Sequence, residues 1–359
     1  MRSFFTFFLV LLLASFSLGQ SQEPSPQLKP RPVEPAAPPG PERRINLDVQ
    51  VTDKKGNPIR GLQEQDFTIL DDKQAKKIAS FRAVDATSSV TAEPVEIYLV
   101  VDAVNTNFGT VAYERDQVKT FLQQNGGKLA WPVALVVFSD NETKIQGGFS
   151  RDGNATAALF DQVESGLRTI TRSQGFWGDQ ERLDMSLKAL GELVAQAKTQ
   201  PGRKLIIWFS RGWPMFSQRI TLTEKESQQI FSSIVAESAE LRQDRITLYS
   251  VDPGGTEGGS VFGNTHYEEF ETGVKSVSGA YPGDLGLQVL AVQSGGRVFY
   301  LSNDMVGEIA NCVADANAYY VVSFDSPPAD RQDEYHALQV KVDKGGATVR
   351  TRTGYYAHP

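Results

Sequence analysis

EIYLVVDAVNTNF, residues 96–108, is the stretch of sequence that decides how this chain folds. It starts with a near-continuous apolar run, as in a strand that is covered on both faces inside a parallel sheet. The run ends at Asp102, and the small polar residues Asn105 and Thr106 follow closely. Because ligands of an open α/β sheet bind beyond the carboxyl ends of its strands, these polar side chains mark a candidate site.

Residues 93–316, which surround this stretch, alternate apolar strands with helical patterns. Further strands are expected at 133–139, 144–150, 204–210, 245–252 and 296–301. Helices are expected from Asp152 onward, around 221–243 and around 284–294. Strands and helices that alternate at this spacing predict an α/β fold with a doubly wound, mostly parallel sheet.

The two ends of the chain have a different, all-β pattern. Residues 45–92 begin with INLDVQVTD, in which apolar residues alternate as in a half-buried strand, and two more short strands follow. Residues 317–359 contain three further short runs that are rich in β-branched and aromatic residues. Because three strands alone make a poor domain, we expect both segments to form one discontinuous all-β sandwich domain. The α/β domain is then inserted between its halves.

The N-terminus is typical of an exported protein. Residues 1–19 combine Arg2, a short apolar core and small residues before a cleavage point, which predicts a signal peptide. An uncleaved membrane anchor is the alternative. Residues 20–44 are rich in Pro and poor in large apolar residues, which predicts a disordered linker. We therefore expect a periplasmic or extracellular protein with no stable membrane span after signal cleavage.

Composition argues against several classes of function. The net charge of −7 and the pI of about 5.2 speak against nucleic acid or an anionic membrane as the main partner. The single cysteine, Cys312, excludes an internal disulfide, and its apolar context favours a core residue. The sequence has three histidines but no zinc-protease motif, nucleophile elbow or phosphate loop, so we do not expect an enzyme. For the adjacent acids Asp71 and Asp72, a solvated turn is favoured over a calcium site.

Several pieces of the sequence, taken in order, carry a family resemblance. They are VTDKKGNPIRGLQEQDFTILDD near the start, VVDAVNT, PGRKLIIWFSRGWP, ITLYSVDP and SGGRVFYLSND in the middle, and AYYVVSF with VRTRTGYY at the end. Together they cover nearly all of residues 45–357. The α/β part resembles a von Willebrand factor type A domain, and the whole chain resembles the VWFA-related proteins of the exported acidobacterial type.

This resemblance implies a metal site that has degenerated. The parent domain holds a divalent cation with Asp-x-Ser-x-Ser, a Thr from a second loop and an Asp after the fourth strand. Asp102 and Thr106 match the first Asp and the second Ser, whereas Val104 replaces the first Ser and Arg211 replaces the last Asp. For the loop Thr, Thr171 is the nearest match. No cofactor is therefore expected, and Mg²⁺ or Mn²⁺ held by Asp102 and Thr106 is the disfavoured alternative.

The replaced acid suggests two interpretations of Asp102. Its carboxylate is expected either to pair with Arg211 in the place of the metal or to cap the turn or helix that follows. The long segment 253–283 is Gly-rich and carries aromatic residues, so it is either a partner-binding lid or an insertion without a role. The segment around Trp213 is either an exposed anchor or, by slight preference, a hydrophobic plug.

These features together predict an exported, non-enzymatic protein-binding module, for adhesion or as a scaffold. Its partner is a protein, and the expected binding residues are Asp102, Asn105, Thr106, Arg211, Trp213, Phe262 and Tyr267. The first alternative is a metal-dependent adhesin with a weak Mg²⁺ or Mn²⁺ site at Asp102 and Thr106. A hydrolase that uses unrecognised residues is the second.

Overall fold

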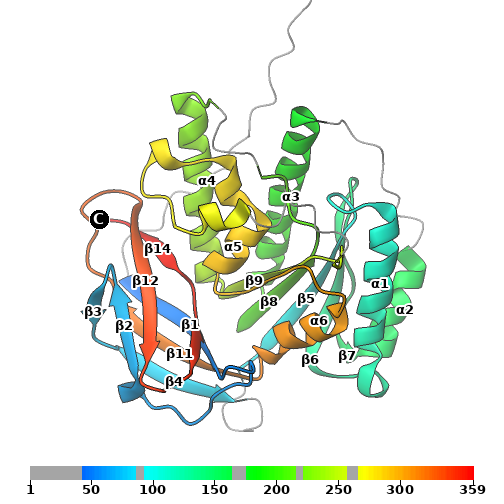
Figure 1. The fold of residues 1–359 in the computed structure, drawn as a ribbon, viewed down its shortest axis with the longest axis horizontal. Helices are drawn as coiled ribbons and strands as arrows, with labels where there is room; N and C mark the ends of the chain where they lie inside the picture. The colour runs from blue at the N-terminus through cyan, green and yellow to red at the C-terminus, as the bar shows by residue number, and fades with distance from the viewer. Residues whose placement is uncertain (1–42, 86–92, 164–174, 216–220, 257–265) are drawn as a thin grey trace, which may run out of the picture.

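The computed structural model describes residues 43–85, 93–163, 175–215, 221–256 and 266–359 (Figure 1). The signal peptide expected at 1–19 and nearly all of the linker expected at 20–44 lie outside these ranges. The described residues form one six-stranded sheet, two four-stranded sheets and six α-helices. Among these helices, none combines the length and the apolar character needed to cross a membrane.

The six-stranded sheet forms the centre of the molecule. In spatial order its strands are β10 (Val298–Phe299), β9 (Ile246–Val251), β8 (Arg203–Phe209), β5 (Val95–Asp102), β6 (Lys128–Phe138) and β7 (Thr143–Asp152). All neighbouring strands are parallel except β6 and β7, which form the expected antiparallel edge. The prediction of a mixed α/β fold with a mostly parallel sheet is therefore confirmed.

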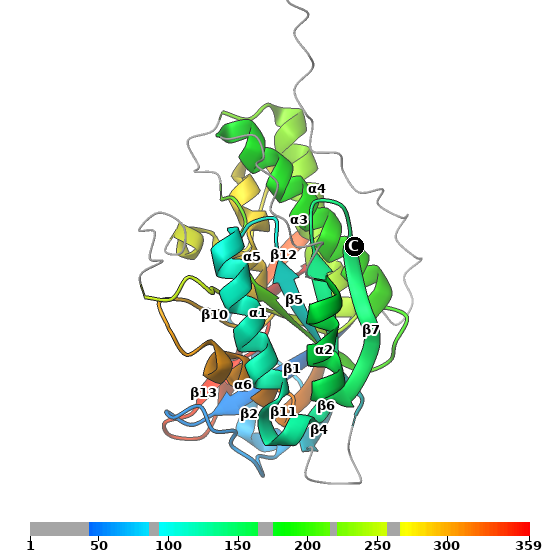
Figure 2. The same cartoon turned by 90° about the vertical axis from the view of Figure 1, so that its right-hand side faces the viewer.

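Helices cover both faces of this sheet (Figures 1 and 2). One face carries α1 (Phe108–Leu122), α2 (Gly153–Val163) and α6 (Met305–Ala314), and the other carries α3 (Phe176–Ala197), α4 (Glu224–Gln243) and α5 (Leu287–Gln293). Single side chains fix where several helices begin. Asp152 accepts a hydrogen bond from the backbone of Ala155 at 3.0 Å, and Asn107 and Thr223 cap α1 and α4 in the same way. Cys312 of α6 is fully buried, as expected, and burial raises the pKa of its thiol.

The two antiparallel sheets mix strands from both ends of the chain. One has the order β13 (Thr348–Arg350), β1 (Arg44–Thr52), β11 (Ala318–Asp325) and β4 (Ser80–Asp85), and the other β14 (Gly354–Ala357), β12 (Glu334–Val342), β2 (Phe67–Asp71) and β3 (Gln74–Lys76). Their inner faces share one apolar core, which contains Leu47, Ile69, Val322 and Val340. Short 3₁₀ helices complete the described elements: Glu64–Asp66, Gln124–Gly127, His266–Phe270, Val277–Gly279 and Pro282–Leu285.

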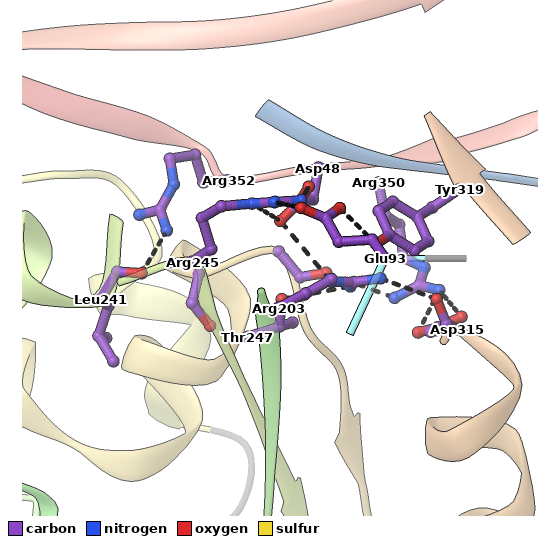
Figure 3. A network of polar contacts seen from close by, with 12 residues as sticks. Asp48, Glu93, Arg203, Leu241, Arg245, Thr247, Asp315, Tyr319, Arg350 and Arg352 are labelled. Carbon is purple, nitrogen blue, oxygen red and sulfur yellow. Dashed lines mark hydrogen bonds and ion pairs between the residues drawn. The ribbon is translucent and has the colours of Figure 1, made fainter. Parts of the chain in front are cut away.

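A buried arginine joins the α/β part to the antiparallel sheets (Figure 3). Arg203 opens β8 and is 0% exposed. Its guanidinium donates to the backbone oxygen of Asp315 at 2.8 Å, lies 3.7 Å from the Asp48 carboxylate of β1 and stacks 4.5 Å from the centre of the Tyr319 ring of β11. Because a buried charge is costly unless it is paired, these contacts fix how the two parts are oriented.

Arg245 strengthens the same junction from the turn before β9. It donates to the carboxylates of both Asp48 and Glu93. Burial alone would raise the pKa of the Glu93 carboxyl, but the hydrogen bonds and charges of Arg245 and Arg82 lower it to about 2. The Glu93 carboxylate at the junction therefore stays ionised throughout the neutral range.

Replacement of Arg203 by Leu should lower the free energy of unfolding by about 3 kcal/mol, because the Asp48 carboxylate loses one of its two cations inside the protein. Urea denaturation measures the change. The matched control is Arg44→Leu, which removes an exposed ion pair with Asp325 and should cost less than about 1 kcal/mol. Equal losses in the two variants would contradict the structural role assigned to Arg203.

Candidate functional site

The candidate site lies where the order of the central strands reverses. Along the chain, β6 and β7 follow β5 on one side, whereas β8, β9 and β10 lie on the other. The carboxyl ends of β5 and β8 therefore flank the switch point, which is where an open α/β sheet offers a crevice. Asp102 ends β5 and Ser210 directly follows β8, and both are 0% exposed.

The Asp102 carboxylate accepts four hydrogen bonds. Its Oδ1 accepts from the backbone N–H groups of Val104 at 2.9 Å and Asn105 at 2.8 Å. Its Oδ2 accepts from Nδ2 of Asn105 at 2.8 Å and from the indole N–H of Trp208, on β8, at 2.9 Å. Asn105 Nδ2 also lies 2.9 Å from the hydroxyl of Ser186 on α3. One carboxylate thus ties the loop after β5 to the neighbouring strand and, through Asn105, to a helix.

These contacts occupy the whole acceptor capacity of the carboxylate. A carboxylate has about four lone-pair sites, and each of the four donors takes one. Burial raises the pKa of the Asp102 carboxyl, while the bonds from Asn105 and Trp208 act in the opposite direction. Because every partner is a donor, the arrangement suits the ionised acid. A divalent cation could bind this carboxylate only by displacing one of these donors.

The predicted pair between Asp102 and Arg211 is wrong. The four groups that donate to Asp102 belong to three residues, Val104, Asn105 and Trp208. The Nε of Arg211 instead lies 4.0 Å from the carboxylate of Asp252, which follows β9. The alternative, in which Asp102 caps the turn that follows, agrees with the two backbone bonds. The residue after Arg211 has to be a glycine, because Gly212 has φ of 99° and a Cβ there would lie 2.1 Å from the Gln288 side chain.

Two buried acids that sequence reasoning missed lie near the acids that end the central strands: Glu114 near Asp102 and Asp252, and Glu308 near Asp252. Glu114 of α1 is 0% exposed, and both of its carboxylate oxygens are buried. Burial, followed by the negative charge of Asp102, raises its pKa well above the usual value. Burial likewise raises the pKa of Glu308, on α6, to about 7. The missed signal was the position of Glu114 between Val111 and Val118 on the apolar face of its helix.

Four of the expected binding residues are buried: Asp102, Thr106, Trp213 and Tyr267. Trp213 is 3% exposed and packs edge-on against Trp208 with ring centres 5.1 Å apart, which agrees with the plug interpretation. Tyr267 is 7% exposed and packs in one cluster with Phe270 and Val289, so it is no exposed anchor of a lid. The apolar rings turn inward because α5 offers them a surface to cover. Phe262 and Thr171 lie outside the described residues.

Unsatisfied polar atoms remain beside Asp102. The Thr106 hydroxyl and the Asn105 side-chain oxygen are buried and, within the described part of the chain, have no hydrogen-bond partner. Thr106 itself is 4% exposed. The structure therefore brings together Asp102, Asn105 and Thr106, with Arg211 on the neighbouring strand end. These two oxygens are the feature that favours a residual cation site.

Three exposed hydrophobic side chains belong to segments at the carboxyl side of the central sheet. Among the described residues, the large hydrophobic side chains that are exposed are Tyr113 at 38%, Trp177 at 52% and Leu301 at 50%. Tyr113 lies near the start of α1, Trp177 at the start of α3 and Leu301 just after β10. Because helices of such a fold run antiparallel to the strands, all three positions belong to the carboxyl side of the sheet. The Tyr113 hydroxyl donates to the backbone of Asn303 at 3.4 Å, which links α1 to the segment after β10.

Comparisons with known proteins give matches among solved structures. No protein-family model matches the sequence, and no curated protein matches it. The chain is similar to a mutant of the PilB minor pilin from Streptococcus sanguinis, with 11% identity over 64% of each chain and a TM-score of 0.35. It is also similar to the pilus adhesin SpaC from Lactobacillus rhamnosus GG, with 12% identity over 85% of this chain and 48% of that one and a TM-score of 0.36.

A third similar structure is the SpRpn10 VWA domain, with 15% identity over 45% of this chain and 75% of that one and a TM-score of 0.23. The chain spans less than two thirds of the length of either pilus protein. With TM-scores this low, the function proposed below rests on the residues of this chain.

Replacement of Asp102 by Ala should lower the free energy of unfolding by about 3 kcal/mol, because four donors lose their acceptor inside the protein. Denaturation in EDTA and in excess Mg²⁺ should give the same loss. Asp116→Ala, at an acid of α1 whose side chain is 69% exposed, is the control and should change stability by less than about 0.5 kcal/mol. A loss that appears only in Mg²⁺ would show instead that Asp102 is a metal ligand.

Stability should fall as the pH rises from about 4.5 to about 7. The folded-state pKa of Glu308 is raised to about 7 and that of Asp184, in α3, to about 6 by burial, so the folded protein keeps protons that the unfolded chain has lost. Urea denaturation across this range measures the slope. A rise in stability over this window would contradict the burial of protonated acids.

Replacement of Glu114 by Gln should stabilise the protein by about 1 kcal/mol at pH 8 and by less at pH 5.

Proposed function

We propose that this chain is an exported, non-enzymatic protein-binding module for adhesion or scaffolding. In this proposal its α/β part is a type A-like domain of the von Willebrand class with a degenerate metal site. Its partner docks on the carboxyl side of the central sheet, on a surface that we call the edge surface: Tyr113, Trp177, Arg211 and Leu301 with the loop 103–107. The Pro-rich residues 20–44 are proposed as the tether on which the folded part is presented.

The observation that carries the proposal is the exposure of three large hydrophobic side chains in segments at the carboxyl side of the central sheet. Single exposed hydrophobic residues are normal on a protein surface. Tyr113, Trp177 and Leu301 nevertheless come from three segments far apart in the sequence and share the side on which open α/β sheets bind their ligands. Aromatic side chains and arginine are also the residues enriched at protein–protein contacts, and Arg211 supplies the cation.

The hydrogen bonds of Asp102 support binding without a metal. Its carboxylate has four protein donors, and Val104 and Arg211 stand at two positions where the parent domain has ligands. The absence of a recognisable nucleophile and base in the sequence supports a binding role over hydrolysis. A metal-dependent adhesin is the second candidate, and the unpartnered oxygens of Asn105 and Thr106 are the observation that favours it.

Site-specific photo-crosslinking tests the proposal, because it captures a bound protein whatever its identity. The photoreactive residue p-benzoylphenylalanine replaces Trp177 or Leu301 in protein exported by its source organism. The matched control position is Lys55, which is exposed in a turn of the antiparallel sheets. We expect one protein adduct that is common to Trp177 and Leu301, absent at Lys55 and formed equally well in EDTA.

Two outcomes would overturn parts of this proposal. The same adducts at Lys55 as at Trp177 would remove the edge surface as the docking site. Loss of the adduct in EDTA, with recovery in Mg²⁺, would favour the metal-dependent adhesin.

A further inference from the structure

A histidine and two aspartates meet at the rim of the β-sandwich core, far from the edge surface. Asp71 ends β2, Asp72 follows in the turn to β3, and His336 lies on β12. Asp71 is 1% and His336 is 8% exposed, and both stand at inward-facing positions that their strands otherwise fill with apolar residues. Polar side chains at core positions require a partner, because burial of an unpaired charge is costly.

One nitrogen atom faces both carboxylates. Nδ1 of His336 lies 3.0 Å from Oδ1 of Asp71 and 3.3 Å from Oδ2 of Asp72. The three atoms all lie within 4.8 Å of one another. A single ring nitrogen offers at most one proton, so it cannot fully satisfy two carboxylate oxygens at once. A cation at the common point would satisfy all three atoms.

Each carboxylate keeps its other oxygen fixed by the protein. Oδ2 of Asp71 accepts from the Tyr355 hydroxyl at 3.3 Å and lies 3.4 Å from Nζ of Lys76. Oδ1 of Asp72 accepts from the backbone N–H of Ala337 at 3.0 Å. Such outer contacts orient the ligands of a metal site. The His336 ring stacks on Tyr355 with centres 5.0 Å apart, which fixes the ring so that Nδ1 faces the two carboxylates. Its Nε2 is buried without a partner in the described ranges.

The spacing agrees with a tetrahedral zinc site. Zn²⁺ binds imidazole nitrogen and carboxylate oxygen at about 2.0 Å, which puts neighbouring ligands of a tetrahedron about 3.3 Å apart. The two distances from Nδ1 to the carboxylates, 3.0 and 3.3 Å, match this value. A site with one imidazole suits Zn²⁺ better than Mg²⁺ or Ca²⁺, which prefer oxygen alone.

We propose that Asp71, Asp72 and His336 form a zinc site that links β2 and β12, strands from the two ends of the folded chain. Asp72 has a side chain that is 49% exposed, which gives the ion a path in and leaves the fourth position for water. Lys76 offsets part of the negative charge, so the affinity is moderate. Because Asp71 and His336 belong to strands from opposite ends of the chain, bound Zn²⁺ stabilises the pairing of β2 with β12.

Calorimetric titration of Zn²⁺ into EDTA-treated protein, with thermal unfolding beside it, tests the proposal. We expect one equivalent to bind and the unfolding temperature to rise, whereas Mg²⁺ does neither. Asp72→Asn is the main variant, because Asn tolerates the positive φ of 47° and keeps the oxygen that Ala337 needs. It should weaken Zn²⁺ binding by roughly tenfold or more.

Two further variants locate the ion. His336→Gln should abolish binding, whereas His358→Gln should leave it unchanged, although His358 also lies 3.3 Å from an acid, Asp333. No heat with Zn²⁺ in the unsubstituted protein would overturn the proposal. Binding that survives both Asp72→Asn and His336→Gln would do the same, because the ion would then lie elsewhere.

Discussion

The Asp102 carboxylate is the group on which the candidate site depends. It stands at the switch point of the sheet, and its four donors come from the loop that follows and from β8. Here Asn105 and Trp208 hold the acid directly, so the loop is fixed by hydrogen bonds within the protein.

A second constraint ties this site to the rest of the molecule. Arg203 and Arg245 connect the central sheet to Asp48 and Glu93, so the antiparallel sheets and the α/β part are joined by one buried and three half-buried charges (Figure 3). Arg203 enters at the start of β8, and Asp102 receives Trp208 near the end of the same strand. β8 therefore carries the junction at one end and the candidate site at the other.

The sequence predicted the parts of the fold that follow from periodicity. Apolar runs and helical spacing revealed the parallel sheet, its antiparallel edge and the helix that Asp152 opens. Side-chain direction was not predictable in this way. A pair between Arg211 and Asp102 was one of two interpretations, but in the structure the Nε of Arg211 lies 4.0 Å from the carboxylate of Asp252. Tyr267 was expected to bind a partner because it lies in a long, Gly-rich segment with several aromatic residues, but it packs with Phe270 and Val289 of α5, a contact that only the tertiary structure reveals.

The most direct test of the account is a calorimetric titration of Mg²⁺ into the EDTA-treated protein. The comparison variant combines Val104→Ser with Arg211→Asp, which adds a hydroxyl and a carboxylate beside Asp102. The account predicts no heat from the unsubstituted protein, because the carboxylate of Asp102 is already fully hydrogen-bonded, and binding of Mg²⁺ by the variant. Uptake of one equivalent by the unsubstituted protein, abolished by Asp102→Ala, would contradict it.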